Sequence, residues 1–246
     1  MLRLRHEAMR KRANNGRAFN FVVVGFFAIS MATCLIGCRS QAAATAESST
    51  EGPPNVKPES PNVVSLNPQD WYILYSAQMP SHPSSDNEGV WSFEFPSSQD
   101  GGHVNYVQTP FNATTTPSSI TISFKVESNA PEYVVVDPTD TLPATTRLFF
   151  EQQETDLTNT NGRWWADASI SNLGSQDGQT ITFTVPLTSD QWTNVNGKQD
   201  AQALAAAIAN IGWVGMTFGG QDFAGHGVAI SNGTAKYILV SYTVNF

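Results

Sequence analysis

Two predicted strands, 147–153 and 163–170, carry the side chains of this sequence that are best suited to chemistry. Alternation with apolar residues places polar and aromatic side chains on one face of each strand. These side chains are Arg147, Glu151, Arg163, Trp165 and Asp167. If the strands pair as a hairpin, the five form one patch. The apolar side of a pyranose ring packs on an aromatic ring, and its hydroxyls bond to carboxylates and guanidinium groups. The pattern therefore favours a ligand-binding face with Trp165 as an exposed stacking platform.

Two other interpretations of this face remain open. The first is an ordinary solvated sheet surface with Arg147–Glu151 and Arg163–Asp167 ion pairs and Trp165 under a loop. The second is catalytic, because glycosidases use two carboxylates about 5–10 Å apart.

Glu151 with Glu154, or Glu151 with Asp167, could form that pair of carboxylates. The sequence has no nucleophile elbow and no HExxH motif to accompany them. We therefore predict no catalytic residue.

Metal and cofactor sites are not indicated by residue spacing. The histidines that follow the N-terminal segment are His82, His103 and His226, and none is within metal-ligand spacing of another. Loop carboxylates could hold a structural Ca²⁺. The candidates are Asp86, Asp137, Asp140 and Asp222. No spacing selects them, so we expect no cofactor.

The N-terminal segment has the organisation of a secretory signal, with six basic residues before an apolar run at 18–34. The run ends in Leu35-Ile36-Gly37-Cys38. This ending resembles the lipobox of bacterial lipoproteins. The resemblance implies a signal peptide at 1–37 and a lipid such as palmitate on Cys38, which anchors the chain to a membrane. Arg39 in place of an aspartate then favours the outer membrane or cell surface. The alternative is an uncleaved membrane anchor, because a spanning helix needs about 20 apolar residues.

Residues 38–68 are rich in Ala, Ser, Thr, Glu and Pro and poor in large apolar residues. Such a segment cannot bury enough apolar surface to offset its ordering entropy, so we predict a disordered tether. Its mean reach as a flexible coil would be roughly 30 Å.

The net charge indicates which partners are disfavoured, and the positions of the cysteines indicate what can stabilise the domain. Beyond residue 17 the chain has 7 basic and 20 acidic side chains, a net charge of -13. This acidity argues against a nucleic-acid partner. The only cysteines are Cys34 and Cys38. The predicted domain, 69–246, therefore depends on its apolar core.

The domain is predicted to consist of short strands. Apolar and polar residues alternate in 119–127 and in 180–187, which is typical of half-buried antiparallel strands. Weaker strand patterns occupy 71–75, 90–95, 103–107, 147–153, 163–170, 213–218, 227–230 and 235–244, with turn residues such as Asn232-Gly233 between them. The expected core includes Ile122, Phe124, Phe183, Val185, Met216 and Phe218.

One segment, 200–211, has a helical period, with Asp200 as a possible N-cap and Gly212 as the end. Many short strands and one helix predict an all-β, two-sheet antiparallel sandwich of jelly-roll type.

The order of aromatic-ended strands in 70–246 resembles galactose-binding-like jelly rolls, which include many bacterial carbohydrate-binding modules. The segments that carry the resemblance are 163–165, 183–187, 192–198 and 211–220. Taken with the polar and aromatic patch and the lipobox, it favours a non-catalytic, surface-tethered module that binds a glycan. The competing class is a structural or protein-interaction lipoprotein, such as an adhesion protein, without a sugar site.

Overall fold

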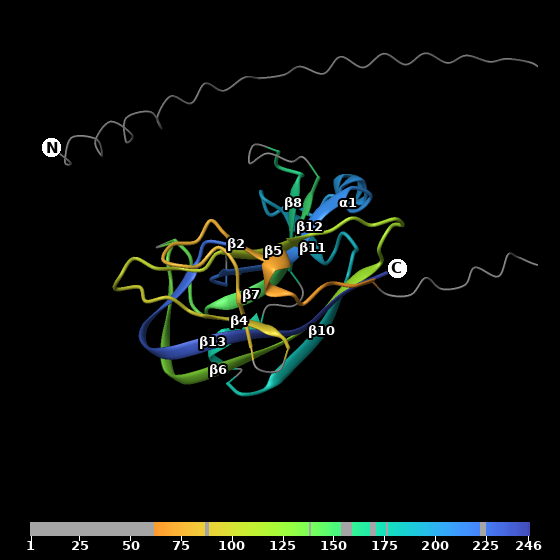
Figure 1. Ribbon diagram of the computed structural model, residues 1–246. Coiled ribbons are helices and arrows are strands. Elements are labelled where there is room, and N and C mark those ends of the chain that lie inside the picture. The colour runs from red at the N-terminus through yellow and green to blue at the C-terminus, as the bar shows by residue number, and fades with distance from the viewer. Residues whose placement is uncertain are drawn as a thin grey trace, which may run out of the picture. The chain divides into compact units, whose positions relative to one another are not determined.

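Two antiparallel sheets face one another in the computed structural model (Figure 1). The first sheet has the order β10 (Thr180–Pro186), β6 (Ser119–Val135), β13 (Val228–Asn245), β4 (Trp91–Glu94), β3 (Ser84–Ser85), and β1 (Asn62–Val63) also pairs with β13. The second has the order β11 (Trp192–Asn194), β8 (Arg163–Ala166), β7 (Thr145–Gln152), β12 (Ile211–Gly219), β5 (Tyr106–Pro110), β2 (Tyr72–Leu74), and β9 (Ser171–Asn172) also pairs with β7. The predicted jelly-roll sandwich is confirmed.

The structure describes residues 62–86, 89–137, 139–153, 159–167, 171–175, 177–221 and 225–246, all within one unit, Asn55–Phe246. The predicted signal peptide and Cys38 lie outside the described residues. Two segments placed in the tether by the prediction contact the sandwich: β1 pairs with β13, and Val64 is buried.

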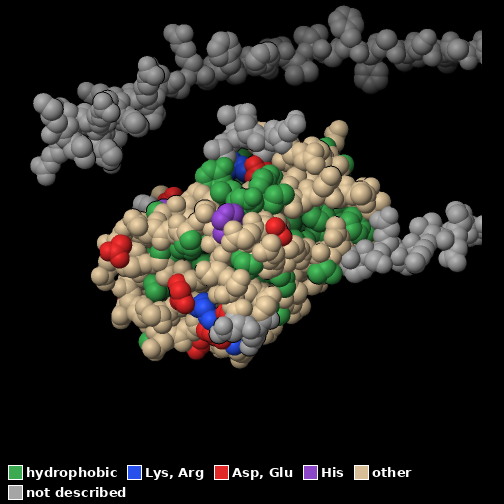
Figure 2. All heavy atoms as spheres, viewed as in Figure 1, with side chains coloured by type: hydrophobic (Ala, Val, Ile, Leu, Met, Phe, Trp, Pro, Cys, Tyr) green, Lys and Arg blue, Asp and Glu red, His purple; other side chains and the backbone are tan. Residues whose placement is uncertain are grey.

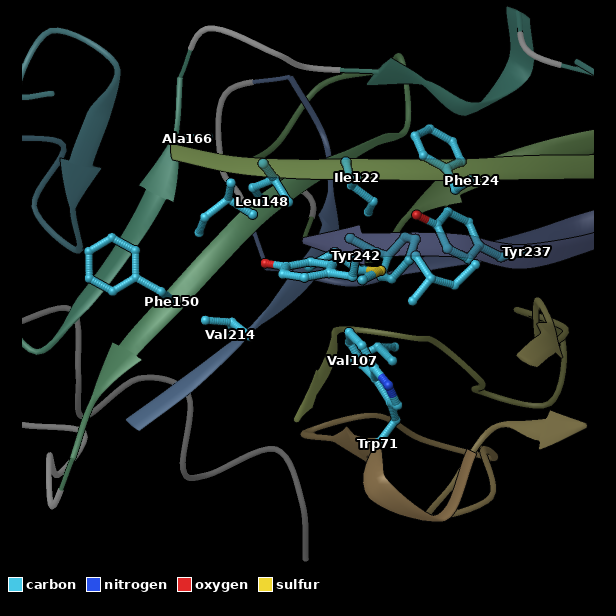
Figure 3. Packing of buried hydrophobic residues seen from close by; sticks show 14 of the residues in the cluster. Trp71, Val107, Ile122, Phe124, Leu148, Phe150, Ala166, Val214, Tyr237 and Tyr242 are labelled. Atoms are coloured by element: carbon cyan, nitrogen blue, oxygen red, sulfur yellow. The ribbon is translucent and has the colours of Figure 1, made fainter. Parts of the chain in front are cut away.

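The core lies between the sheets and is built from alternate residues of each strand. Leu148 and Phe150 of β7 point into it, as does Ala166 of β8 (Figure 3). Aromatic rings fill much of the space: Tyr237 stacks on Phe124 with ring centroids 5.0 Å apart. Burial of such rings supplies the main stabilisation of a domain without disulfides.

Five of the six predicted core residues are buried, and Phe183 is not. Phe183 is half-buried and meets Phe124 edge-on at 6.3 Å. Its strand, β10, is an edge strand of the first sheet. An edge strand has a neighbour on one side only, so its apolar row is less completely covered.

The helix α1 (Ala201–Ile208) begins as predicted and ends early. The Asp200 side chain accepts a hydrogen bond from the Ala203 N–H at 3.0 Å, which is an N-cap. The predicted end at 211 is wrong, because Ile211 starts β12 and pairs with Gln152 of β7. Within the described residues, no helix is long and apolar enough to cross a membrane.

The strand β13 also differs from its prediction as two strands. It runs through Asn232-Gly233, where a turn was expected, and register shifts near Asn232 absorb the irregularity. Bulges of this kind let a strand continue past turn-forming residues. β13 pairs with β6 from Val228 to Asn245.

Candidate functional site

A cleft of about 660 Å³ opens on the outer face of the second sheet. Its floor includes Tyr106 of β5, Arg147 of β7 and Trp165 of β8, which point away from the core. Its walls are Tyr75, the segment 194–197 at the end of β11, and the loop residues 225–226. Gly225 is required in the wall because a Cβ there would lie 2.7 Å from the Tyr106 hydroxyl.

The hairpin expected from the sequence is present. β7 and β8 pair with Phe149 opposite Trp165 and Glu151 opposite Arg163. The predicted side chains therefore share one sheet face. Arg147, Arg163 and Trp165 line the cleft, while Glu151 and Asp167 lie beside the two arginines.

Trp165 is not the exposed platform that the sequence pattern suggested, since only 6% of the residue is exposed. A row of aromatic rings covers it. Ring centroids are 5.3 Å apart for Trp165 and Phe149, 5.1 Å for Phe149 and Tyr106, and 5.5 Å for Tyr106 and Tyr75. Alternation assigned Trp165 to the correct face. It could not show that other rings pack on that face.

Tyr75 is the exposed ring of this row, with 57% of the residue accessible, and it lines the mouth of the cleft. Its φ of 54° is rare for an aromatic residue and has a conformational cost. The next residue fixes the turn: the Ser76 hydroxyl donates to the Leu74 carbonyl at 3.0 Å and accepts from the Asn105 N–H at 2.9 Å. The turn therefore holds the Tyr75 ring at the cleft.

The ion pair of the β7–β8 hairpin runs across the two strands rather than along one of them. Arg147 Nη1 lies 3.8 Å from Asp167 Oδ1, and Arg147 Nη2 donates to the Gln221 carbonyl. The expected Arg147–Glu151 and Arg163–Asp167 pairs are replaced because residues four apart in a strand are roughly 13 Å apart, against about 5 Å for neighbours on adjacent strands.

Arg163 takes part in two further interactions at the cleft floor. Its guanidinium carbon is 5.7 Å from the Trp165 ring centroid, within cation–π range. Burial raises the pKa of Glu151, and the opposite charge of Arg163 acts against that rise. Burial also raises the pKa of Tyr106 to about 12, so its phenol is neutral at ordinary pH.

His226 adds an imidazole to the cleft wall. Its Nδ1 is 3.2 Å from Asp137 Oδ2. Hydrogen bonds from Thr139 hold the pKa of Asp137 below its ordinary value. On the face seen in Figure 2, Lys and Arg side chains lie next to Asp and Glu side chains rather than in a patch of one sign.

The geometry offers little for the catalytic interpretation. Glu151 stands opposite Arg163 and Asp167 lies beside Arg147, so the two carboxylates occupy opposite ends of the hairpin. Their backbone positions are separated by roughly 13 Å along the strands, beyond the spacing of a glycosidase pair. Glu154 lies outside the described residues.

The candidate calcium ligands do not gather. Asp86 pairs with Lys236, Asp137 with His226, and Asp140 accepts the Gly220 N–H at 2.7 Å. Among the residues that the structure describes, no three His, Cys, Asp or Glu side chains form a metal-binding group. Asp222 is not among the described residues.

Several residues of the cleft were not predicted from the sequence. They are Tyr75, Asn105, Tyr106, Thr193, Val195 and His226. Most belong to loops or strand ends, where no periodicity marks a face. The one available signal was Tyr75, a large aromatic residue at the end of a predicted strand and next to a serine.

Comparison with known proteins gives a limited answer. No protein-family model matches the chain, and no curated protein matches it. A similar solved structure is the xylan-binding module CBM15, with a TM-score of 0.38 and 13% identity, covering 74% of this chain and 97% of that one. Another is CtCBM11, known from a solution-structure and binding study, with a TM-score of 0.37 and 12% identity over 72% and 88% of the two chains. Likeness at this level does not identify a ligand.

Proposed function

We propose that the domain is a non-catalytic module that binds carbohydrate in the cleft of the second sheet. The observation that carries the proposal is the exposed Tyr75 ring beside a floor of polar and aromatic side chains. An aromatic ring packs on the C–H face of a sugar, and arginines, amides and hydroxyls bind its oxygens. In this proposal Tyr75 replaces Trp165 as the stacking ring. Arg147 and Arg163 supply polar contacts, with Glu151 and Asp167 beside them.

The test is glycan binding by the purified unit Asn55–Phe246 and its variants. Tyr75→Ala should weaken binding at least about tenfold, which is about 1.4 kcal/mol, and leave the melting temperature nearly unchanged because the ring is exposed. Tyr75→Phe should bind as the parent does. Tyr72→Ala is the control, since Tyr72 is on the preceding strand and outside the cleft. A folded protein that binds no glycan, or full binding by Tyr75→Ala, contradicts the proposal.

We also propose that the domain is tethered to a membrane by a lipid on Cys38, with outer-membrane or cell-surface location. The support is the sequence Leu35-Ile36-Gly37-Cys38 after an apolar run. Cys38→Ala should abolish labelling by a fatty-acid probe and leave an uncleaved precursor. Persistent labelling of Cys38→Ala, or fractionation with the inner membrane, counts against this anchor or this location.

The competing class is a structural or protein-interaction lipoprotein. The burial of Trp165 and the paired arginines favour it, because both are features of a stable sheet surface. It predicts that the folded domain binds no member of a glycan array. The Tyr75 variants then change neither glycan binding nor the melting temperature.

A further inference from the structure

The two arginines and the histidine that line the cleft each have a carboxylate nearby. Arg147 has Asp167 at 3.8 Å, and His226 has Asp137 at 3.2 Å. Arg163 stands opposite Glu151 and attracts its charge. An anionic ligand would therefore bring an unbalanced negative charge next to three carboxylates, and desolvating such a charge is costly.

Two residues that line the cleft each have a buried polar atom without a hydrogen-bond partner in the described part of the chain, and the two atoms restrict the chemistry of a ligand that could bond to them. Trp165 Nε1 and Asn105 Oδ1 make no hydrogen bond to any of the described residues, and both residues line the cleft. One is a donor and the other an acceptor. A buried polar atom without a partner costs about 1–3 kcal/mol. Carboxylate and sulfate groups accept only, so they cannot satisfy Asn105 Oδ1, whereas a hydroxyl both accepts and donates.

From these two observations we infer that the cleft selects uncharged, hydroxyl-bearing saccharides and discriminates against those with uronate or sulfate groups. The inference rests on the proposed function and adds the ligand class. Trp165 Nε1 donates a hydrogen bond to one ligand hydroxyl, and Asn105 Oδ1 accepts one from another. Asp167 beside Arg147 and Glu151 opposite Arg163 disfavour ligand anions.

The experiment measures binding of five probes to the unit Asn55–Phe246 by calorimetry. The neutral probes are the hexasaccharides of xylose, β-1,4-linked glucose and mannose, and the anionic probes are hexagalacturonate and a heparin hexasaccharide. At least one neutral probe should bind, and its affinity should change less than about twofold between about 0.01 and 0.15 M salt, because no net charge is neutralised. The anionic probes should bind at least about tenfold more weakly.

Variants separate the two parts of the inference. Trp165→Phe keeps an aromatic ring and removes the N–H, so neutral binding should fall about tenfold; Asn105→Ala should act likewise. Thr217→Val is the matched control, since Thr217 Oγ1 is also buried without a partner among the described residues but does not line the cleft. Asp167→Asn frees Arg147 from its counter-charge and should improve binding of hexagalacturonate.

The outcomes are distinguishable. Salt-sensitive binding of an anionic probe, as strong as that of any neutral probe, overturns the inference and leaves the proposed function standing. Unchanged neutral binding in both Trp165→Phe and Asn105→Ala also overturns it. Failure of all five probes to bind the folded domain contradicts the proposed function itself.

Discussion

Trp165 lines the cleft and is packed at the same time, and its truncation tests the packing. The residue is 6% exposed and its ring meets Phe149 at 5.3 Å. We expect Trp165→Ala to lower the free energy of unfolding by about 3–5 kcal/mol, because it leaves a cavity among aromatic rings. Urea denaturation measures this. Such a loss leaves the stacking role to Tyr75, whereas a loss below about 1 kcal/mol would mean that the ring is accessible after all.

Phe183 is the complementary case, since it was expected in the core and is half-buried. Phe183→Ala should cost about 1–2 kcal/mol, below the 3–5 kcal/mol of a fully buried phenylalanine. Phe124→Ala is the matched control, because Phe124 is fully buried and contacts Phe183. Equal losses in the two variants would show that the edge strand β10 is covered in solution.

At the scale of elements, the sequence predicted what depends on local pattern. Alternation in β6, β7 and β10 assigned their faces because one side of each strand must meet the core. It could not set the ends of β6 and β13. Both strands continue through residues that favour turns, because the long pairing between them outweighs local preference.

The cleft could be predicted only in part for a related reason. β7 and β8 are neighbours in sequence, so their common face followed from a hairpin. Tyr75, Asn105 and His226 reach the same cleft from distant parts of the chain. Their convergence depends on the order of strands in the second sheet, and no local pattern encodes that order.

The helix α1 gives a prediction that concerns one element. Asp200 accepts the Ala203 N–H and satisfies one of the free donors at the helix start. Asp200→Ala should lower the free energy of unfolding by about 1 kcal/mol, and Asp200→Asn should cost little because asparagine also caps. Urea denaturation of the two variants separates the cap from the charge. Equal losses would indicate that the charge of Asp200 stabilises the fold.

Carboxylates that accept hydrogen bonds from neighbouring side chains set part of the response of the domain to acid. On the first sheet, hydrogen bonds from Lys125 and Lys236 hold the pKa of Glu127 below its ordinary 4.5. A carboxylate with a lowered folded-state pKa stabilises the fold fully above the unfolded-state value, and the contribution is lost as the pH falls through the folded-state pKa. The pKa of Asp190 is also lowered, by hydrogen bonds from Thr188 and Gln191.

Glu151 at the cleft shifts in the opposite direction, because burial raises its pKa. Between the unfolded-state value of 4.5 and the higher folded-state value, lowering the pH therefore favours the folded state. The unfolding free energy should thus level off or rise slightly as the pH approaches 4.5 from above, and then fall. Glu151→Gln should remove the levelling or rise of the unfolding free energy above pH 4.5 and keep its fall below pH 4.5.

Glu127→Gln should remove part of the loss below pH 4.5. The side chain is 43% exposed, so screening by solvent limits its share to about half a kcal/mol. Urea denaturation at intervals from about pH 3 to 7 measures both variants against the parent. If Glu127→Gln and the parent lose stability in parallel below pH 4.5, the pairs with Lys125 and Lys236 do not stabilise the domain, and its acid response must come from other carboxylates.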